Sequence, residues 1–362
     1  MLQRSIRARD IQPFHVMELL RRARELEAQG RDIIHMEVGE PDFPTPQPII
    51  EAAMRFIASG DVHYTPGLGL PALREAIARY YHDRFDTHVA PERIIVTAGA
   101  SGALMLALAA TTDPGDEWLL PDPGYPSNRH LVRSFEGTAR SLPVDAIARY
   151  QPTPEQLDAA WGERSRGLMV ASPSNPTGTL LSSDEIAALH GVTRARGGVL
   201  IVDEIYQGLS YGVEASTALA YPVMNAADDL FVVNSFSKYF GMTGWRLGWL
   251  VAPEGMVRDI EKLAQHFFIS PSTPAQHAAL AAFRPETLDI LEARRCEFGV
   301  RRDTLLLPTD INYHRDHLGV VQNNFPAIIR LGDGDEVRDV PHPLSAFGLE
   351  VYDFRIVDSL SI

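Results

Sequence analysis

The stretch "NSFSKYFGMTGWRLGW", residues 234–249, carries one of the two lysines of the chain, and Lys262 is the other. The residues before Lys238 are typical of a buried strand, so its amine is expected to be partly desolvated, which lowers the amine pKa. A neutral amine can form a Schiff base with a carbonyl compound, which arginine cannot do. The stretch therefore indicates covalent chemistry at Lys238 on a carbonyl cofactor or substrate; the alternative is an ordinary solvated lysine.

Two further features suit a phosphate group. Arg246 follows Lys238 by eight residues, is permanently charged, and presents a fork of N–H donors that matches phosphate. The small-residue stretch "TAGASGAL", residues 97–104, opens a predicted helix, and backbone N–H groups at a helix N-terminus attract anions. The same small residues would also serve simply to allow a tight turn from strand to helix.

Other polar side chains stand at the ends of predicted strands. Asn175 follows "GLMVASPS", Asp203 follows "GVLIV", and Ser235 follows "LFVVN". Ligands of open α/β sheets bind beyond the carboxyl ends of the strands, so these residues are expected to meet although they lie far apart in sequence. Taken singly, Asp203 could cap a helix or bind a metal, and Asn175 could simply form the turn "SNPTG".

The surrounding pattern explains how these residues would be positioned. Strands alternate with helices from about residue 91, and apolar runs such as "VLIV" and "LFVV" suit strands covered on both faces. The sequence therefore predicts an α/β fold around a mostly parallel sheet. The predicted strands lie in residues 93–99, 117–123, 167–178, 197–206, 230–238 and 245–253. Helices are predicted for residues 14–29, 47–59, 72–85, 101–112, 125–136, 182–196 and 256–268.

Bulk properties limit the other classes of function. The chain has 362 residues, 45% of them hydrophobic, and a formal net charge of −14, which argues against nucleic acid as the main partner. Cys296 is the single cysteine, so no intrachain disulfide can form and a reducing compartment is expected. The N-terminus lacks an apolar signal-peptide core, and the longest apolar run, residues 102–110, is too short for a membrane span. These features predict a cytoplasmic protein.

With these residues in place, the chain resembles the fold-type I enzymes that depend on pyridoxal 5'-phosphate (PLP), specifically the class I/II aminotransferases. The resemblance covers residues 4–306, approximately, and rests on the ordered motifs "VGEPDF", "YTPGLG", "SPSNPTG", "VDEIY" and "SFSKYFGMTGWRLGW". It implies PLP as cofactor, an L-amino acid and a 2-oxo acid as substrates, and a homodimer as the active unit. It implies no metal, no nucleic acid and no membrane partner.

The resemblance also implies a role for each polar residue. Lys238 would hold PLP through a Schiff base and carry the proton during transfer, and Asp203 would keep the pyridine nitrogen protonated. Asn175 and Tyr206 would bind the phenolic oxygen, and Tyr125 would stack on the ring. Lys238, Asp203 and Tyr206 are thus the predicted catalytic residues. The phosphate would be held by Ala100, Ser101, Gly102, Ser235, Ser237 and Arg246.

Further implied contacts concern the partner subunit and the substrate. Tyr64, in "HYTPGLG", would reach the phosphate of the neighbouring subunit, and Gly39 and Asn175 would line the site of the substrate carboxylate. In this family an arginine near the C-terminus clamps that carboxylate, and Arg355 is the candidate here. Residues 307–362 depart from the family pattern, however, and losing such a buried ion pair would cost on the order of 2–5 kcal/mol.

Substrate and reaction type leave alternatives. Ser101 stands where some aspartate-using relatives carry a lysine, which favours neutral or mixed substrates. Another PLP reaction on the same scaffold, such as β-elimination at a C–S bond, would use the same cofactor residues. A third possibility is a PLP-binding chain whose catalysis is impaired by its atypical C-terminal segment. A PLP-binding transcription regulator is disfavoured, because the chain is acidic and starts directly with the aminotransferase-like helix.

The resemblance implies a large domain and a smaller α+β domain. Residues 1–45 would form the N-terminal part of the small domain, and residues 46–270 the large PLP-binding domain. Residues 271–362 would form the C-terminal part of the small domain, with 307–362 atypical. The site would lie between the domains and at the dimer interface.

Overall fold

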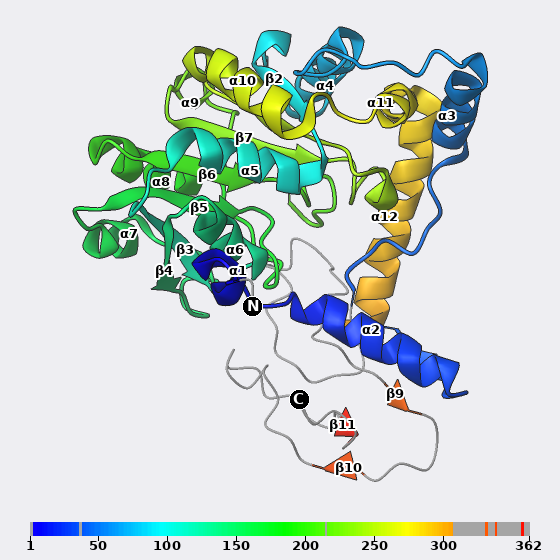
Figure 1. The fold of residues 1–362 in the computed structure, drawn as a ribbon, viewed down its shortest axis with the longest axis horizontal. Helices are drawn as coiled ribbons and strands as arrows, with labels where there is room; N and C mark the ends of the chain where they lie inside the picture. The colour runs from blue at the N-terminus through cyan, green and yellow to red at the C-terminus, as the bar shows by residue number, and fades with distance from the viewer. Residues whose placement is uncertain are drawn as a thin grey trace.

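The computed structural model describes residues 3–35, 38–213 and 216–306, and three short strand segments beyond them. A seven-stranded sheet forms the centre (Figure 1). Its strands are β2 (Ile94–Thr97), β3 (Glu117–Asp122), β4 (Thr138–Pro143), β5 (Ser165–Ala171), β6 (Val199–Asp203), β7 (Leu230–Ser235) and β8 (Gly248–Val251). They are ordered β2-β8-β7-β6-β5-β3-β4, and only β8 runs antiparallel to its neighbours. The predicted α/β fold with a mostly parallel sheet is confirmed.

Helices cover both faces of this sheet, because its strands are apolar on both sides. Successive strand residues point to opposite faces, so Ile94 belongs to one layer of the core and Ile95 to the other. The layer of Ile95 contains α5 (Gly99–Thr111), α6 (Ser127–Ser134) and α10 (Val257–Phe268). The layer of Ile94 contains α4 (Pro71–Phe85), α7 (Pro154–Ala160), α8 (Ser183–Ala195) and the short α9 (Pro222–Asn225).

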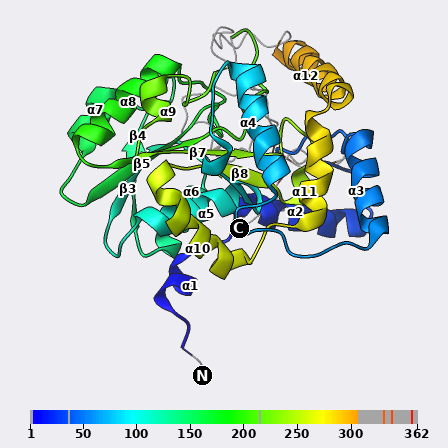
Figure 2. The ribbon, with the colours of Figure 1, turned by 90° about the horizontal axis from the view of Figure 1, so that it is seen from above.

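Five helices of the described residues remain: α1 (Ile6–Asp10), α2 (His15–Ala28), α3 (Gln47–Ser59), α11 (Thr273–Ala279) and α12 (Pro285–Leu306). Of these, α3, α11 and α12 add buried residues to the layer of Ile94, whereas α1 and α2 add none to either layer. Figure 2 shows α3, α11 and α12 at the end of the molecule opposite to α7 and α8. The short strands pair antiparallel, β1 (Ile33–Ile34) with β9 (Arg330–Leu331) and β10 (Val337–Arg338) with β11 (Ile356–Val357). No helix of the described residues combines the length and the apolar character needed to cross a bilayer.

Two helix starts differ in a way that matters for the site. α8 begins with a capping box, in which Ser182 Oγ accepts from the Glu185 N–H at 3.2 Å and the Ser182 N–H donates to Glu185 Oε2 at 2.7 Å. α5 begins at Gly99 without any side-chain cap. Since the first four N–H groups of a helix have no partner within it, the start of α5 presents backbone donors beside the sheet.

The proline-rich segment 38–46 makes hydrogen bonds both to the helix α12 and to the loop that follows β7. Thr45 Oγ1 donates to the Gly241 carbonyl oxygen at 3.2 Å. On the other side, Arg301 of α12 contacts both carboxylate oxygens of Asp42, at 2.8 and 3.0 Å. The segment has no regular structure, as its prolines predict, yet hydrogen bonds hold it on both sides.

Candidate active site

The topology brings the predicted polar residues to one edge of the sheet. β5, β6 and β7 are parallel, and β2 runs in the same direction because both β2 and β7 are antiparallel to β8. Asn175 follows the carboxyl end of β5, Asp203 ends β6, Ser235 ends β7, and α5 starts directly after β2. Lys238 lies in the loop after β7. The strand assignments from the sequence predicted this convergence correctly; the roles of the residues stay predictions.

The amine of Lys238 lies at the centre of this edge. Its Nζ donates to the carbonyl oxygen of Gly39 and lies 5.5 Å from the centroid of the Tyr206 ring. Burial lowers the pKa of Lys238 to about 8, with Glu40 acting against this shift and Arg246 supporting it. A neutral, nucleophilic amine is therefore far more available near neutral pH than in a solvated lysine.

Asp203 places a buried carboxylate at the same edge. Its side chain is 7% exposed, and Oδ1 accepts from the Ile205 N–H at 3.0 Å. Burial raises the pKa of Asp203 to about 6, while this backbone hydrogen bond acts in the opposite direction. A cationic partner would stabilise the carboxylate and lower its pKa again. The environment of Asp203 thus favours a cationic partner.

Asn175 and Tyr206 bring two hydrogen-bond donors together near the lysine. Asn175 Nδ2 donates to Tyr206 Oη at 3.4 Å, and the Tyr206 side chain is buried. The backbone just beyond Tyr206 is fixed by Gly208 (φ +91°), where an added Cβ would lie 2.9 Å from the ring of Tyr239. An amide N–H and a phenol O–H at one point suit an anionic oxygen of a ligand.

The start of α5 forms a cradle for an anion. Gly99 has φ +71°, and a Cβ added there would lie 2.9 Å from Arg246 Nη2, so the guanidinium lies directly against the first turn of the helix. At Gly248 an added Cβ would lie 2.9 Å from the Ala100 nitrogen, so β8 also needs a glycine to approach this turn. Backbone N–H groups, the helix dipole and a fixed positive charge together favour a phosphate here.

Two buried serines lie at the end of the neighbouring strand. The Ser237 N–H donates to Ser235 Oγ at 3.0 Å, and Ser235 Oγ donates to Ser237 Oγ at 2.8 Å. Ser235 Oγ also lies 3.1 Å from the Leu247 carbonyl oxygen. The loop from β7 to Lys238 is thus ordered by its own hydroxyl groups, which hold the lysine at the strand end.

The other predicted site residues are more dispersed. Tyr125 follows β3 and packs edge-on against the Phe14 ring, with the ring centroids 5.9 Å apart. Tyr64, between α3 and α4, is 80% exposed, so most of its side chain is free of contacts within the chain. Ala100 and Gly102 are buried in the first turn of α5, whereas Ser101 is exposed. Arg355 lies outside the described residues.

Sequence reasoning missed some residues that shape the site. Gly248 is needed for the approach of β8 to α5, and the repeated glycine of "GWRLGW" is a signal that could have revealed it. Tyr239, directly after the lysine, donates to Glu292 Oε1 of α12 at 2.6 Å. Glu292 also pairs with Arg84 of α4 at 3.1 Å. No local motif reveals such a contact, because its partners come from distant parts of the chain.

The donor set fits a PLP molecule. The uncapped start of α5 with Arg246 offers a phosphate site, and Asp203 is poised to hold a protonated pyridine nitrogen. The Lys238 amine matches the aldehyde group of PLP. Over the residues that the structure describes, no group of three or more His, Cys, Asp or Glu side chains is arranged to hold a metal ion.

Comparison with known proteins identifies the family of the chain. The sequence profile of the family described as "Aminotransferase class I and II" matches residues 31–308. The valine–pyruvate aminotransferase of Mycobacterium tuberculosis is 36% identical over 296 residues, which are 82% of this chain and 75% of that protein. The aspartate aminotransferase of Thermotoga maritima is 35% identical over 266 residues, 74% of this chain and 70% of that protein.

Solved structures give the same result. A crystal structure of an aminotransferase from Mycobacterium tuberculosis superposes with a TM-score of 0.80 at 35% identity, covering 84% of this chain and 78% of that one. The Thermus thermophilus aspartate aminotransferase with maleate gives a TM-score of 0.79 at 33% identity, covering 85% and 80%. The chain belongs to the class I and II aminotransferase family, whose members are PLP-dependent enzymes of fold type I.

Proposed function

We propose that this aminotransferase moves an amino group from an L-amino acid to a 2-oxo acid, with Lys238 as the residue that holds PLP covalently. The observation that carries the proposal is the buried Lys238 amine, whose pKa is lowered to about 8, at the same sheet edge as Asp203 and the uncapped start of α5. When bound, PLP supplies the aldehyde that accepts the amino group and a ring that withdraws electrons from the substrate Cα.

The residues would divide the remaining tasks. Lys238, once released, would move the proton at the reacting carbon, because a neutral amine near neutral pH is a competent base. Asp203 would keep the ring nitrogen protonated, and Asn175 and Tyr206 would hold the phenolic oxygen through their two donors. Tyr125 would cover the ring face. The phosphate would be bound by Ala100, Ser101, Gly102, Ser235, Ser237 and Arg246.

The rate at which cofactor-free protein attaches PLP is expected to rise with pH and to level off above about pH 8, because the neutral amine attacks. An unperturbed lysine would give a rate that still climbs toward about pH 10. At pH 7 about one Lys238 amine in ten would be neutral, against roughly one in three thousand for the unperturbed group. Stopped-flow absorbance between about pH 6 and about pH 10 measures this. A steady climb through pH 9 would contradict the lowered pKa.

The substrates we propose are neutral or mixed amino acids rather than aspartate alone. Ser101, exposed at the start of α5, is uncharged and offers no cation to a second substrate carboxylate. Gly39 and Asn175 would line the site of the α-carboxylate. The relatives named above include both a valine–pyruvate and an aspartate enzyme, so valine with pyruvate is the first pair to assay. The aminotransferase family suggests a role in amino-acid metabolism, and a single cysteine, which can form no intrachain disulfide, suits a reducing compartment such as the cytoplasm.

The product assay also tests the proposed reaction type. Purified enzyme with PLP is incubated with single L-amino acids and a 2-oxo acid, and the new amino acid, free ammonia and thiol are measured. Amino transfer predicts a new amino acid and a new 2-oxo acid in equal amounts, without ammonia. Release of ammonia and thiol from sulfur-containing substrates, without a new amino acid, would show a C–S lyase instead.

We further propose a homodimer in which Tyr64 serves the site of the other subunit. The residue is 80% exposed, and Met54, Ile57 and Val62 close to it in sequence are also exposed apolar side chains. Several exposed apolar side chains within one short segment favour a protein interface there. An active site completed by the partner would explain why a tyrosine of the family motif is exposed in the single chain.

Mixing two inactive variants tests this arrangement. Tyr64→Ala is expected to bind PLP roughly 10- to 100-fold more weakly, since a hydrogen bond to a charged group contributes about 1.5–3 kcal/mol, and Lys238→Ala to be inactive. After dissociation and reassociation of the mixture, half of the dimers are hybrids with one native site each, so about one quarter of native activity should return at limiting PLP. No recovery in hybrids would contradict the sharing of Tyr64, and sedimentation velocity verifies that hybrids form.

A further inference from the structure

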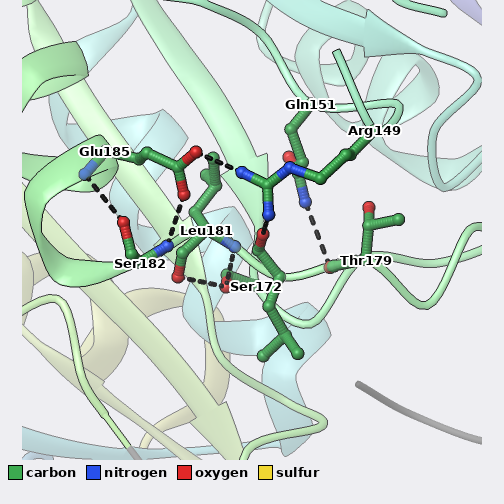
Figure 3. A network of polar contacts seen from close by, with 8 residues as sticks. Arg149, Gln151, Ser172, Thr179, Leu181, Ser182 and Glu185 are labelled. Carbon is green, nitrogen blue, oxygen red and sulfur yellow. Dashed lines mark hydrogen bonds and ion pairs between the residues drawn. The ribbon is translucent and has the colours of Figure 1, made fainter. Parts of the chain in front are cut away.

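A network of hydrogen bonds and an ion pair lies next to the loop that carries Asn175 (Figure 3). The loop leaves β5 at Ala171 and returns toward α8. It is closed by the Ser174 N–H, which donates to the Thr179 carbonyl oxygen at 2.9 Å. Ser172 Oγ accepts from the Leu181 N–H at 2.9 Å. The two stems of the loop are therefore tied to each other.

Gln151 fixes both stems from outside the loop. It is 2% exposed, and its Nε2 donates to the Ala171 carbonyl oxygen at 3.1 Å and to the Thr179 carbonyl oxygen at 3.2 Å. One amide group thus spans the exit and the return of the loop, using both of its N–H groups. A buried amide with such defined partners is costly to disturb, because removing it takes one donor from each of the two carbonyl groups. The Thr179 carbonyl oxygen would keep the Ser174 N–H as its donor.

The backbone before Gln151 has an unusual conformation. Arg149 and Tyr150 both have φ +54°, a left-handed conformation that is costly for residues with a side chain. Arg149 in turn donates to the Leu180 carbonyl oxygen at 3.4 Å and pairs with Glu185, the residue of the α8 capping box (Figure 3). Two successive residues in this costly conformation indicate that the contacts of Arg149 and Gln151 together hold the backbone in place.

We infer that Gln151 is a positioning residue that sets the place of Asn175 toward the bound cofactor. The inference rests on the proposed function, because it assumes that Asn175 donates to the phenolic oxygen. Asn175 Nδ2 lies 3.4 Å from Tyr206 Oη, at the long end of hydrogen-bond distances. A small displacement of the loop therefore removes the donor from the point that it shares with Tyr206.

The visible absorption of lysine-bound PLP changes with pH as the bound cofactor loses a proton. The pH at the midpoint of this change reports the hydrogen bond from Asn175. A donor to the charged phenolic oxygen favours the deprotonated form of the bound cofactor, so losing the donor raises the midpoint. Gln151→Met keeps the length of the side chain and removes both N–H groups. We expect it to raise the midpoint by about 0.5–1 pH unit, the equivalent of one hydrogen bond, and to weaken PLP binding about three- to tenfold.

A double-mutant cycle separates positioning from a general loss of structure. Asn175→Ala should raise the midpoint at least as much as Gln151→Met, and adding Gln151→Met to Asn175→Ala should change it no further. Gln156→Leu is the matched control, since Gln156 bonds only within the start of α7, to the Thr153 N–H at 3.0 Å. It should leave the midpoint unchanged. If Gln151→Met does not fold, Gln151→Leu, which is also apolar and removes both donors, replaces it.

The outcomes distinguish the inference from the proposed function. Suppose that Asn175→Ala shifts the midpoint. If Gln151→Met then gives no shift, or shifts the midpoint equally in native protein and in Asn175→Ala, the positioning role alone would be overturned. No shift with Asn175→Ala itself would overturn the proposed contact of Asn175 with the cofactor, and the role of Gln151 with it. A shift caused by Gln156→Leu would also count against the inference, because disruption near α7 would then suffice.

Discussion

Replacing Lys238 with alanine or with arginine is expected to lower the rate of amino transfer at least about 10⁴-fold, the upper range of what a single positioned acid–base group contributes. Among the residues that the structure describes at this sheet edge, Lys238 carries the amine that can form a Schiff base with an aldehyde, and arginine keeps the charge but not that chemistry. Steady-state turnover at saturating PLP measures the effect. Because PLP can still occupy the phosphate site, binding should fall much less than turnover.

The other lysine of the chain provides a matched control. Lys262 lies on α10 and is exposed in an ion pair with Asp259. An exposed pair of this kind contributes about 0–1 kcal/mol, so Lys262→Ala should leave turnover within about twofold of the native rate. Borohydride reduction followed by peptide mapping should label Lys238 alone. Label on Lys262, or near-native turnover of Lys238→Ala, would refute the assignment.

Asp203→Asn is expected to slow amino transfer on the order of 10³-fold, because breaking a buried ion pair by removing one partner costs about 3–5 kcal/mol. The amide cannot stabilise a protonated ring nitrogen, and the ring then withdraws electrons poorly. The absorption of bound PLP should persist, since the aldehyde and phosphate contacts are untouched. Single-turnover kinetics with an amino donor separates this chemical defect from weaker binding.

Glu204 is the control for the loss of a buried carboxyl group next to this position. It follows Asp203 directly and is buried, and burial raises its pKa to about 8. Its carboxylate, however, accepts from the Ala218 N–H at 2.6 Å and from Thr217 Oγ1 at 3.0 Å, which are structural contacts. Glu204→Gln should lower the free energy of unfolding by about 1–3 kcal/mol and leave single-turnover rates of the folded enzyme within about threefold. Equal chemical defects in both variants would contradict the specific role of Asp203.

The sequence was most informative where local pattern and ligand chemistry coincide. Continuous apolar runs identified the buried strands, and polar residues at their ends identified the edge where Asn175, Asp203 and Lys238 meet. Helices such as α3, predicted for residues 47–59 and found at Gln47–Ser59, carry strong 3.6-residue patterns. Both kinds of signal are contained in short windows, so a single sequence is enough to reveal them.

Features that depend on contacts between distant segments could not be predicted. The antiparallel direction of β8 follows from how the chain returns between β2 and β7, and no residue within β8 encodes it. The edge strand β4 and helix α7 were not predicted; β4 is largely exposed and polar, so it lacks the apolar run of its neighbours. Gln151 acts through carbonyl groups twenty or more residues away, a relation that no motif displays.

The absorption spectrum of purified protein tests whether Lys238 holds PLP covalently, with native enzyme and Lys238→Ala compared before and after addition of single L-amino acids. Covalent attachment at Lys238 predicts visible absorption in the native enzyme that differs from the PLP merely bound by the variant. It also predicts that donor amino acids convert the native spectrum to the near-ultraviolet form of the aminated cofactor. Identical spectra of the two proteins, or a native spectrum that no amino acid changes, would contradict the account.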